Sequence, residues 1–252
     1  MNEIVVIENI VKVYGSEKNR FNALDDVSLT INEGDFIGIM GPSGSGKSTL
    51  LNIIATIDRA TTGHVLVGGQ KVWAMPDVDL CKYRRDNVGF IFQDCNLLDT
   101  LSIRDNILAP LTLAGIPQEE CNKRLERVTK RMEIIHILDK FPGECSGGEK
   151  QRAAACRALI SSPKMIVADE PTGALDTKNS TELLKILRDL NEKEEITIVM
   201  VTHDALIASY AKTILLIRDG KIDDVMKREE GKQIDFYHNI LDKSSRDSDN
   251  FF

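Results

Sequence analysis

One short stretch of glycine and hydroxyl residues constrains this chain more than any other part of its sequence. Residues 41–49 read GPSGSGKST and lie between two apolar runs, Phe36–Met40 and Leu50–Ile54. The spacing is Gly, four residues, then Gly-Lys-Ser, which is the pattern of a phosphate-binding loop between a strand and a helix. Glycines let successive N–H groups point at an anion, and a helix N-terminus adds its positive dipole end. The sequence therefore predicts a nucleoside triphosphate site, in preference to a glycine-rich turn that only connects two elements.

Individual side chains in this stretch have distinct expected roles. Lys47 can reach the β- and γ-phosphates, and the Ser48 hydroxyl can ligate Mg²⁺. The expected nucleotide contacts here are Gly41, Ser43, Gly44, Ser45, Gly46, Lys47, Ser48 and Thr49.

Composition narrows the class of protein. The chain has 252 residues, a formal net charge of −7, 42% apolar residues and 28% charged ones. These values are typical of a globular protein with a full core, and the negative charge argues against a nucleic-acid partner. No apolar run approaches the roughly 18 residues that span a bilayer, so we expect any membrane role to require a partner. The five cysteines lack metal-ligand spacing and are expected to be reduced thiols in the cytosol.

The order of predicted elements indicates an α/β fold. Residues 4–13 and 22–31 carry strand patterns that predict an N-terminal antiparallel β subdomain. Apolar strands then alternate with helices, which implies a mostly parallel sheet covered by helices. The helical pattern from about residue 97 to 160 reads as an inserted α-helical subdomain, in which Leu125, Val128, Met132, Ile135 and Leu138 form an amphipathic stripe. We expect one domain over 1–228 and a C-terminal extension over 229–252 that is partly flexible.

Two carboxylates end a buried strand, Met165–Ala168. Asp169 is expected to bind Mg²⁺, directly or through water. Glu170 is expected to orient and deprotonate the attacking water. Beside a phosphate loop, this pair points to hydrolysis more than to a solvated strand end.

Polar residues end two further strands. Gln93 follows the apolar run Phe90–Phe92, so its amide can contact Mg²⁺ or the water and sense the γ-phosphate. His203 follows the run Ile196–Val201, and a neutral imidazole can hydrogen-bond both the γ-phosphate and a water-orienting glutamate. The other three histidines, His64, His136 and His238, are interpreted as structural.

A second anion site is predicted at Ser146-Gly147-Gly148-Glu149, where Ser146 and Glu149 have capping-box spacing at a helix start. One chain has one phosphate loop, so a monomer leaves this site unexplained. It is explained if these residues close over the γ-phosphate bound to another copy.

Taken together, these stretches resemble the ATP-binding cassette (ABC) ATPases. The phosphate loop, Gln93, Cys145–Glu149, Asp169–Glu170, Ala174–Asp176 and His203 occur in the order of that family's Walker A, Q-loop, signature, Walker B, D-loop and H-switch. The resemblance covers residues 3–226 and implies a P-loop NTPase core that binds ATP and Mg²⁺. It also implies that Tyr14 stacks on adenine, and that Ser146, Gly147, Gly148 and Asp176 contact the nucleotide of the opposite subunit.

Two positions depart from the family pattern. Cys145 stands where the signature most often has leucine, and Glu149 stands in place of glutamine. Neither supplies the main phosphate contacts, so we expect them to tune activity without abolishing it. DEPTGALD at Asp169–Asp176 is similar to the lipoprotein-release and macrolide-export branch, whereas residues 93–101 and the tail are more similar to bacitracin-resistance (Bce-type) ATPases.

The resemblance implies an ATP-hydrolysing, nucleotide-binding subunit of a bacterial ABC transporter for antimicrobial-peptide resistance or export. Its implied partners are a second copy when ATP is bound, a polytopic membrane permease and, through the permease, a sensor kinase. Its implied location is cytoplasmic, peripheral on the inner face of the cell membrane. The alternative is a soluble ABC ATPase that transports nothing, such as an assembly or repair factor, although the sequence lacks the long coiled-coil insertion of repair members.

Residues 96–101, NLLDTL, are the expected docking segment for the permease. They follow Gln93 and place Leu97, Leu98 and Leu101 among polar residues of a loop. Apolar side chains in a loop are candidates for a partner's surface. The alternative is that they pack under the helical subdomain.

Overall fold

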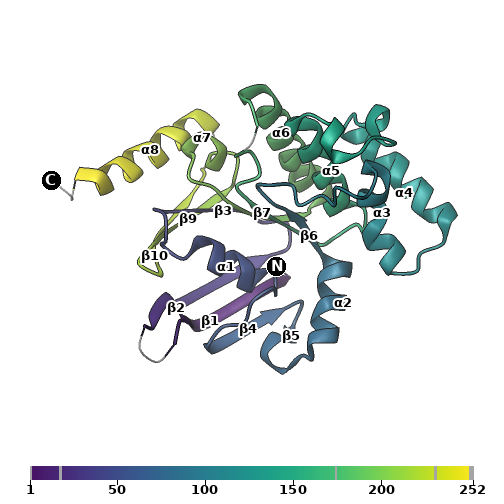
Figure 1. The fold of residues 1–252 in the computed structure, drawn as a ribbon. Helices are drawn as coiled ribbons and strands as arrows, with labels where there is room; N and C mark the ends of the chain where they lie inside the picture. The colour runs from purple at the N-terminus through teal and green to yellow at the C-terminus, as the bar shows by residue number, and fades with distance from the viewer. Residues whose placement is uncertain (1, 17–18, 174, 230–231, 250–252) are drawn as a thin grey trace. The chain divides into compact units, whose positions relative to one another are not determined.

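The computed structural model describes residues 2–16, 19–173, 175–229 and 232–249, with side chains described as far as residue 244 (Figure 1). Ala174 of the predicted D-loop and the last three residues of the predicted C-terminal extension lie outside these ranges. The chain forms two compact units, residues 1–80 with 188–252 (unit 1) and residues 81–187 (unit 2). This division differs from the predicted boundaries at 97, 160 and 228, which stay predictions.

The first sheet of unit 1 is antiparallel, as the N-terminal strand patterns predict. Its order is β2-β1-β4-β5, and Val6 of β1 lies opposite Thr30 on one side and Leu66 on the other. Val5 and Ile7 of β1 are buried, whereas Val6 and Glu8 are not, because one face of the sheet covers the core. The strands are β1 (Glu3–Tyr14), β2 (Phe21–Asn32), β4 (Thr62–Val67) and β5 (Gln70–Lys71).

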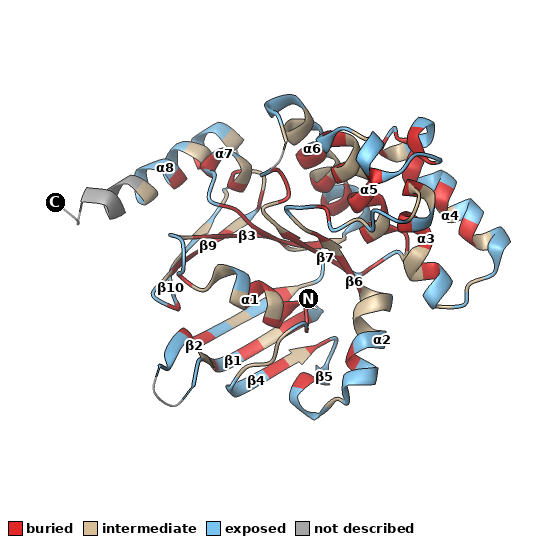
Figure 2. Ribbon diagram, viewed as in Figure 1, coloured by how far each residue is buried: buried red, intermediate tan, exposed pale blue. Residues whose placement is uncertain are grey.

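The second sheet of unit 1 contains the strand that leads into the phosphate loop. In it β3 pairs in parallel with both β8 and β9, and β10 is antiparallel to β9. Every residue of β3 and β8 is buried, which is why both stretches read as continuous apolar runs in the sequence (Figure 2). The strands are β3 (Phe36–Met40), β8 (Thr197–Val201), β9 (Thr213–Arg218) and β10 (Lys221–Lys227).

Most helices of unit 1 pack against these two sheets, and the last one packs against α7. Helix α1 contacts both β8 and β2, so it lies between the sheets, with Leu50, Ile53 and Ile54 fully buried. Helix α8 occupies the predicted C-terminal extension, and Phe236 and Ile240 anchor it one turn apart. The sequence patterns of this segment do not predict the helix. The elements are α1 (Lys47–Ile54), η1 (Val72–Ala74), α7 (Ala205–Ala208) and α8 (Gln233–Asp249).

Unit 2 contains two parallel strands and a group of helices. Strand β6 (Val88–Ile91) pairs with β7 (Met165–Asp169), and helix α5 packs on β6, α3 and α4. The elements of the helical group are α3 (Ile103–Leu113, with Pro110 inside), α4 (Gln118–Arg131), η2 (Ile135–Ile137), η3 (Pro142–Glu144) and α5 (Gly147–Leu159). Two helices, α2 (Asp77–Asn87) and α6 (Thr177–Glu194), cross the division between the units.

One detail of the predicted amphipathic stripe is wrong. Met132 is fully buried, but Ile135 is 53% exposed, and Ile134 and Ile137 are buried instead. Helix α4 ends at Arg131 and Glu133 adopts a left-handed φ of 55°. The helical phase is therefore lost before Ile135.

The cysteines form no disulfides among the described residues. All five cysteines are free thiols, and Cys95, Cys121 and Cys156 are buried. Across the described ranges, the structure has no helix with the length and apolar character that crossing a membrane requires.

Candidate nucleotide site

The phosphate loop in unit 1 requires glycine at two positions. Gly41 has a φ of 150°, and a Cβ there would lie 2.1 Å from the Ile217 carbonyl oxygen. Gly46 has a φ of 104°, and a Cβ there would lie 2.3 Å from the carbonyl oxygen of Ala23. Both positions combine left-handed backbone with close contact to another strand, so any side chain would displace the loop. The loop is thus fixed by β9 and β2 before any ligand binds.

Lys47 and Ser48 begin helix α1 at the end of this loop. The Lys47 ammonium donates to the carbonyl oxygens of Gly41 at 2.9 Å and Pro42 at 2.7 Å. The first turn of α1 contains no acidic residue, so the positive end of the helix dipole is not neutralised there. Ser48 is exposed on that turn. The arrangement of a curled loop, a lysine and a helix N-terminus suits a chain of phosphates.

Ser45 gives a further indication of how the loop is built. Its side chain is only 4% exposed, and its hydroxyl oxygen has no hydrogen-bond partner among the described residues. The Ser45 carbonyl accepts from the Gly220 N–H at 3.0 Å, which ties the loop to the turn between β9 and β10.

Tyr14 lies in unit 1 at the end of β1 and is positioned by Asp58. The Tyr14 hydroxyl donates to Asp58 Oδ2 at 2.6 Å, and Lys12 Nζ donates to Asp58 Oδ1 at 2.6 Å. Lys12 Nζ also lies 4.8 Å from the centroid of the Tyr14 ring, and the Tyr14 hydroxyl interacts with Thr49 of α1. Phe21, 60% exposed, is the partner of Tyr14 across the hairpin, with ring centroids 5.8 Å apart.

Two pKa shifts report on this cluster. Burial opposes ionisation of Asp58, but the hydrogen bonds from Lys12 and Tyr14 outweigh it, so the pKa of Asp58 lies below its ordinary value. Burial, together with the Asp58 hydrogen bond, raises the pKa of Tyr14. The phenol is therefore a neutral donor to a carboxylate, which fixes the plane of an aromatic ring close to the phosphate loop.

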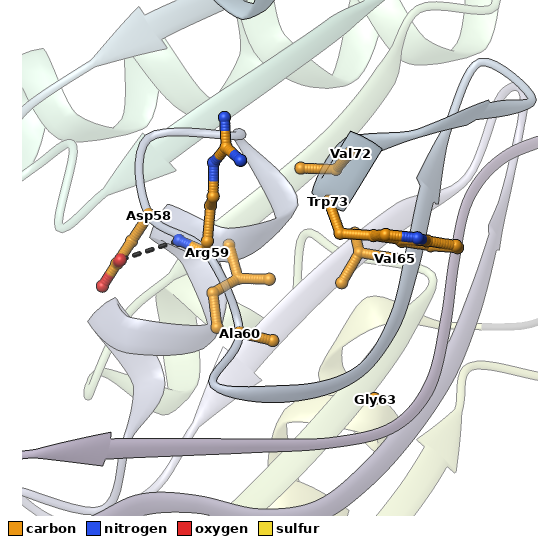
Figure 3. A pocket seen from close by; sticks show the side chains of 8 residues that line it. Asp58, Arg59, Ala60, Gly63, Val65, Val72 and Trp73 are labelled. Carbon is orange, nitrogen blue, oxygen red and sulfur yellow. Dashed lines mark hydrogen bonds between the residues drawn. The ribbon is translucent and has the colours of Figure 1, made fainter. Parts of the chain in front are cut away.

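A small hollow of about 120 Å³ adjoins this cluster (Figure 3). Asp58 Oδ1 accepts the Arg59 N–H at 2.7 Å. Figure 3 marks this bond with a dashed line and shows Trp73 on the other side of the hollow. Trp73 is 43% exposed and lies against His64, with ring centroids 4.7 Å apart. The structural role expected for His64 stays a prediction.

His203 is the last predicted site residue in unit 1. It is exposed and lies two residues beyond the end of β8. The following turn is fixed, because the Asp204 N–H donates to the buried Thr202 hydroxyl and the Asp204 carboxylate caps helix α7. The imidazole is thus presented at the carboxyl end of a buried parallel strand, where ligand sites of α/β sheets occur.

Strand β7 in unit 2 delivers Asp169 and Glu170 as predicted. Asp169 is the last residue of the strand, and Glu170 follows with a left-handed φ of 46°. Such a backbone is uncommon for glutamate and persists where its surroundings fix it. Here the Gly173 N–H donates to the Glu170 carbonyl at 3.0 Å, and this hydrogen bond closes the turn formed by residues 170–173.

Gln93 lies against this same turn. It is exposed and follows the end of β6 by two residues, so the strand ends earlier than the predicted run Phe90–Phe92. A Cβ on Gly173 would lie 3.1 Å from Gln93 Nε2, so the glutamine side chain packs over the glycine. The structure therefore brings Gln93 and the turn after Glu170 together.

The predicted capping box at the start of α5 is confirmed. The Ser146 N–H donates to Glu149 Oε2 at 2.7 Å, and the Glu149 N–H donates to Ser146 Oγ at 3.3 Å. The Ser146 N–H lowers the pKa of the Glu149 carboxyl, so this residue accepts as a carboxylate. Glu149 Oε1 also lies 3.3 Å from His136 Nε2. Burial and the Glu149 charge raise the pKa of the Cys145 thiol, which keeps it protonated.

Asp176 and Gly148 are joined through Asn179. The Asp176 carboxylate accepts from the Asn179 N–H at 2.8 Å and from Asn179 Nδ2 at 2.7 Å. A Cβ on Gly148 would lie 2.7 Å from Asn179 Oδ1, and Arg152 Nη1 donates to that same oxygen at 2.8 Å. Two of the four residues expected to contact an opposite subunit are therefore connected by one side chain.

Sequence reasoning missed Asp58 and Asn179. Each positions a predicted site residue: Asp58 lies 44 positions after Tyr14, whereas Asn179 lies three positions after Asp176. Asn179 had a local signal, because an aspartate three residues before a polar residue at a helix start suggests a cap.

The donor set decides which cation these residues suit. Ser48, Asp169 and Gln93 offer a hydroxyl, a carboxylate and an amide, all hard oxygen ligands. Among the described residues, no cluster of three or more His, Cys, Asp or Glu side chains could hold a metal. Mg²⁺ is commonly bound by one or two protein groups together with phosphates and water. Ser48 in unit 1, and Asp169 and Gln93 in unit 2, are each of a type that suits Mg²⁺ bound with a nucleotide.

Strand β3, the loop over 41–49 and helix α1 define a P-loop nucleotide-binding protein. Comparison with known proteins places the chain within that class. The profile of the family described as ABC transporter matches residues 24–173, more than half of the chain. The chain therefore belongs to the ABC transporter ATP-binding family, and it is an ATPase subunit of a transporter.

Individual relatives agree with this assignment. The chain is 46% identical over 239 residues to YvcR of Bacillus subtilis, an uncharacterized ABC transporter ATP-binding protein, over 94% of this chain and 92% of YvcR. It is 42% identical over 238 residues to the bacitracin export ATP-binding protein BceA of Halalkalibacterium halodurans, over 94% of each. A dimeric, post-hydrolysis structure of the ATP-binding cassette MJ0796 of Methanocaldococcus jannaschii, bound to ADP and Pi, matches with a TM-score of 0.84 and 38% identity, over 90% of this chain and 100% of that one.

Proposed function

We propose that this subunit hydrolyses ATP as a homodimer attached to a membrane permease and serves in resistance to antimicrobial peptides. The observation that carries the proposal is the phosphate loop before α1, which is held in a curled geometry at Gly41 and Gly46 and ends at Lys47. The similarity to BceA supports the choice of peptides as the transported or countered molecules.

In the proposed ATP site, Tyr14 stacks on adenine and residues 41–49 surround the phosphates. The hydrogen bond from Tyr14 to Asp58 reduces the rotation of the ring, so less entropy is lost when the base binds. Lys47 exchanges its bonds to two loop carbonyls for bonds to phosphate oxygens. Ser48, Asp169 and Gln93 would hold Mg²⁺, whose charge would offset that of the phosphates.

In the proposed hydrolysis, Glu170 accepts a proton from the attacking water. Its position directly after β7, on a backbone fixed at a φ of 46°, limits the directions in which its carboxylate can point. Gln93 orients the water or the cation from the adjacent loop, and His203 donates to the γ-phosphate. General-base assistance of this kind contributes about 10²–10⁴ in rate.

In the proposed dimer, Ser146, Gly147, Gly148 and Asp176 of one copy contact the nucleotide bound to the other copy. The N-terminus of α5 supplies N–H groups and a positive dipole end to the γ-phosphate. The capping box and Asn179 keep these residues in place before the copies meet. The dimeric structure of MJ0796 with ADP and Pi supports the proposal that two copies associate.

The proposed docking surface for the permease is the loop over 96–101 and the groove beside it. Leu98 is 56% exposed, but its backbone is fixed: the buried Asn106 accepts from the Leu98 N–H at 2.7 Å and donates to the Leu98 carbonyl at 3.0 Å. An apolar side chain fixed outward is suited to a partner's surface. The adjoining groove, about 260 Å³, is lined by residues that include Arg85, Phe90, Phe92, Asn96, Pro110 and Arg157.

With this docking surface, we expect the subunit to lie on the inner face of the cell membrane, next to a permease that spans it. A sensor kinase would be reached through the permease and not through this chain. The permease would also contain the site for the transported molecule.

The variant Glu170→Gln tests the catalytic part of the proposal. The amide keeps the size and backbone preference of glutamate but cannot accept the proton, so ATP binding should persist while turnover falls at least about tenfold. The ATP-bound dimer should then accumulate, which size-exclusion chromatography would show. Glu119→Gln on the exposed face of α4 is the matched control and should retain turnover. Turnover above about a tenth of wild type in Glu170→Gln would remove Glu170 from this role.

A further inference from the structure

Helix α5 contains a glutamine that is almost completely buried, although its side chain is polar. Gln151 is 1% exposed and lies among buried alanines of α5. An amide buried without hydrogen bonds costs several kcal/mol relative to water, so its partners decide why the fold tolerates it. None of the roles proposed above uses this residue.

Gln151 bridges two loops that hold proposed catalytic residues. Its Nε2 donates to the Phe92 carbonyl at 3.1 Å and to the Pro171 carbonyl at 2.7 Å. Phe92 immediately precedes Gln93, and Pro171 immediately follows Glu170. One amide group is therefore bonded to the direct neighbours of two site residues that are 77 positions apart (170 − 93).

The third bond of Gln151 fixes the amide itself. Gln151 Oε1 accepts from the Cys95 thiol at 2.7 Å, and burial raises the pKa of that thiol, so it remains a donor. The amide therefore has its oxygen and both of its N–H groups bonded, which leaves it one orientation. A buried polar network with every member bonded is rigid and specifies a single geometry.

The loops that Gln151 connects contain uncommon backbone conformations. Glu170, Cys95 and Asn96 have left-handed φ angles of 46°, 60° and 47°. Such residues persist only where neighbouring groups constrain them. A second side chain of α5 acts on the same turn: Arg157 donates to the carbonyl oxygens of Asn96 at 2.5 Å and Cys95 at 2.6 Å. Helix α5 thus sets the geometry of both loops.

We propose that Gln151 is a positioning residue that fixes the spacing between Gln93 and Glu170 through its hydrogen bonds to Phe92 and Pro171. The inference rests on the proposed catalytic roles of Gln93 and Glu170. Because Ser146 caps the N-terminus of α5, the same helix connects the loop proposed to contact the opposite nucleotide to the two residues proposed to act on the water. Formation of the dimer and the position of the catalytic acid are thereby mechanically linked.

The test is the variant Gln151→Met, assayed as the purified full chain with ATP and Mg²⁺. Methionine fills nearly the same volume but forms none of the three bonds. We expect kcat to fall by about tenfold or more, because a displacement of about 1 Å can cost about 10²-fold. The KM for ATP should change by less than about twofold, because Tyr14 and residues 41–49, the proposed adenine and phosphate contacts within one copy, are not bonded to Gln151.

A purely structural role would lower the melting temperature without this split between kcat and KM. Leu125→Ala in the core of unit 2 is the matched control, since Leu125 is 3% exposed and lies on α4. It should lower the melting temperature while kcat stays near wild type. If Gln151→Met and Leu125→Ala lower the melting temperature by the same amount and also have the same kcat, the proposal is overturned.

Two further variants separate the possible failures. If Glu170→Gln retains its turnover, the proposed catalytic function fails, whatever Gln151→Met shows. If Gln151→Met does not fold, Cys95→Ala and Cys95→Ser provide the test, because serine keeps the donor to Gln151 and alanine lacks it. We expect kcat to fall in Cys95→Ala and to be restored in Cys95→Ser, and equal kcat values in the two would overturn the proposal.

Discussion

Replacing Leu98 with glutamate tests whether the loop over 96–101 is the docking segment for the permease. The side chain of Leu98 is 56% exposed, whereas its backbone is fixed on both sides by the buried Asn106. A carboxylate at this position can extend into water, so the substitution changes the surface and not the core. We expect wild-type ATP binding and loss of co-purification with the permease.

The structure sets the expected cost in stability. Complete burial of a leucine contributes about 1.5–3 kcal/mol, and Leu98 is less than half buried, so the loss should be about 1 kcal/mol. In a chain of this size, that corresponds to a fall in melting temperature of about 2–4 °C. An unpaired charge placed in a core would instead cost several kcal/mol.

The assay is co-expression with the permease, affinity purification from membranes and a separate thermal unfolding of the isolated subunit. Ile234→Glu is the matched control, because Ile234 is 52% exposed and lies on α8 in the other unit. Asn106→Ala is the opposite case, since it removes several buried hydrogen bonds and should cost about 3 kcal/mol. Intact co-purification of Leu98→Glu, or a loss of stability like that of Asn106→Ala, would refute the docking role.

Two further predictions concern the dimer and the response to alkali. Ser146→Arg and Lys47→Ala should each abolish turnover, but a mixture of the two variants should regain part of it. The reason is that a mixed dimer has one ATP site with both defects and one ATP site with neither. Heterodimers that form but show no ATPase activity would contradict contact across the dimer. Burial raises the pKa of Tyr83 to about 12. As pH rises, this tyrosine therefore ionises in the unfolded chain before it ionises in the folded one. The stability that its burial contributes is complete below pH about 10 and is lost as pH rises to about 12. Denaturant unfolding in that pH range should show a smaller loss for Tyr83→Phe than for wild type, and equal losses would contradict the assignment.

The features that the sequence predicted are those whose signals are local. The strand, loop and helix over 36–54 follow from apolar runs and glycine spacing, and the capping box of Ser146 and Glu149 follows from a spacing of three residues. The buried strands β3, β7 and β8 are also predictable, because both of their faces are covered and they appear in the sequence as continuous apolar runs.

The features that it did not predict depend on contacts between distant positions. Nothing near Gln151 indicates that its amide lies between residues 92 and 171, which come together only when β6, β7 and α5 pack. The same holds for Asp58 and Tyr14. The left-handed backbone of Glu170 has no signal either, because glutamate does not favour that conformation.

The two hydrogen bonds from Lys47 to the carbonyls of Gly41 and Pro42 have a consequence for how its affinity for phosphate is measured. The usual comparison removes the lysine and assigns the lost binding to the ammonium–phosphate contact. In this chain the ammonium also cross-links the two ends of the loop before nucleotide arrives, so Lys47→Ala changes the reference state along with the complex. The measured difference then combines a lost contact with the entropy of a loosened loop, and it overstates the contact. Lys47→Arg, which retains a donor to the loop carbonyls, gives the comparison in which the reference state is closest to wild type.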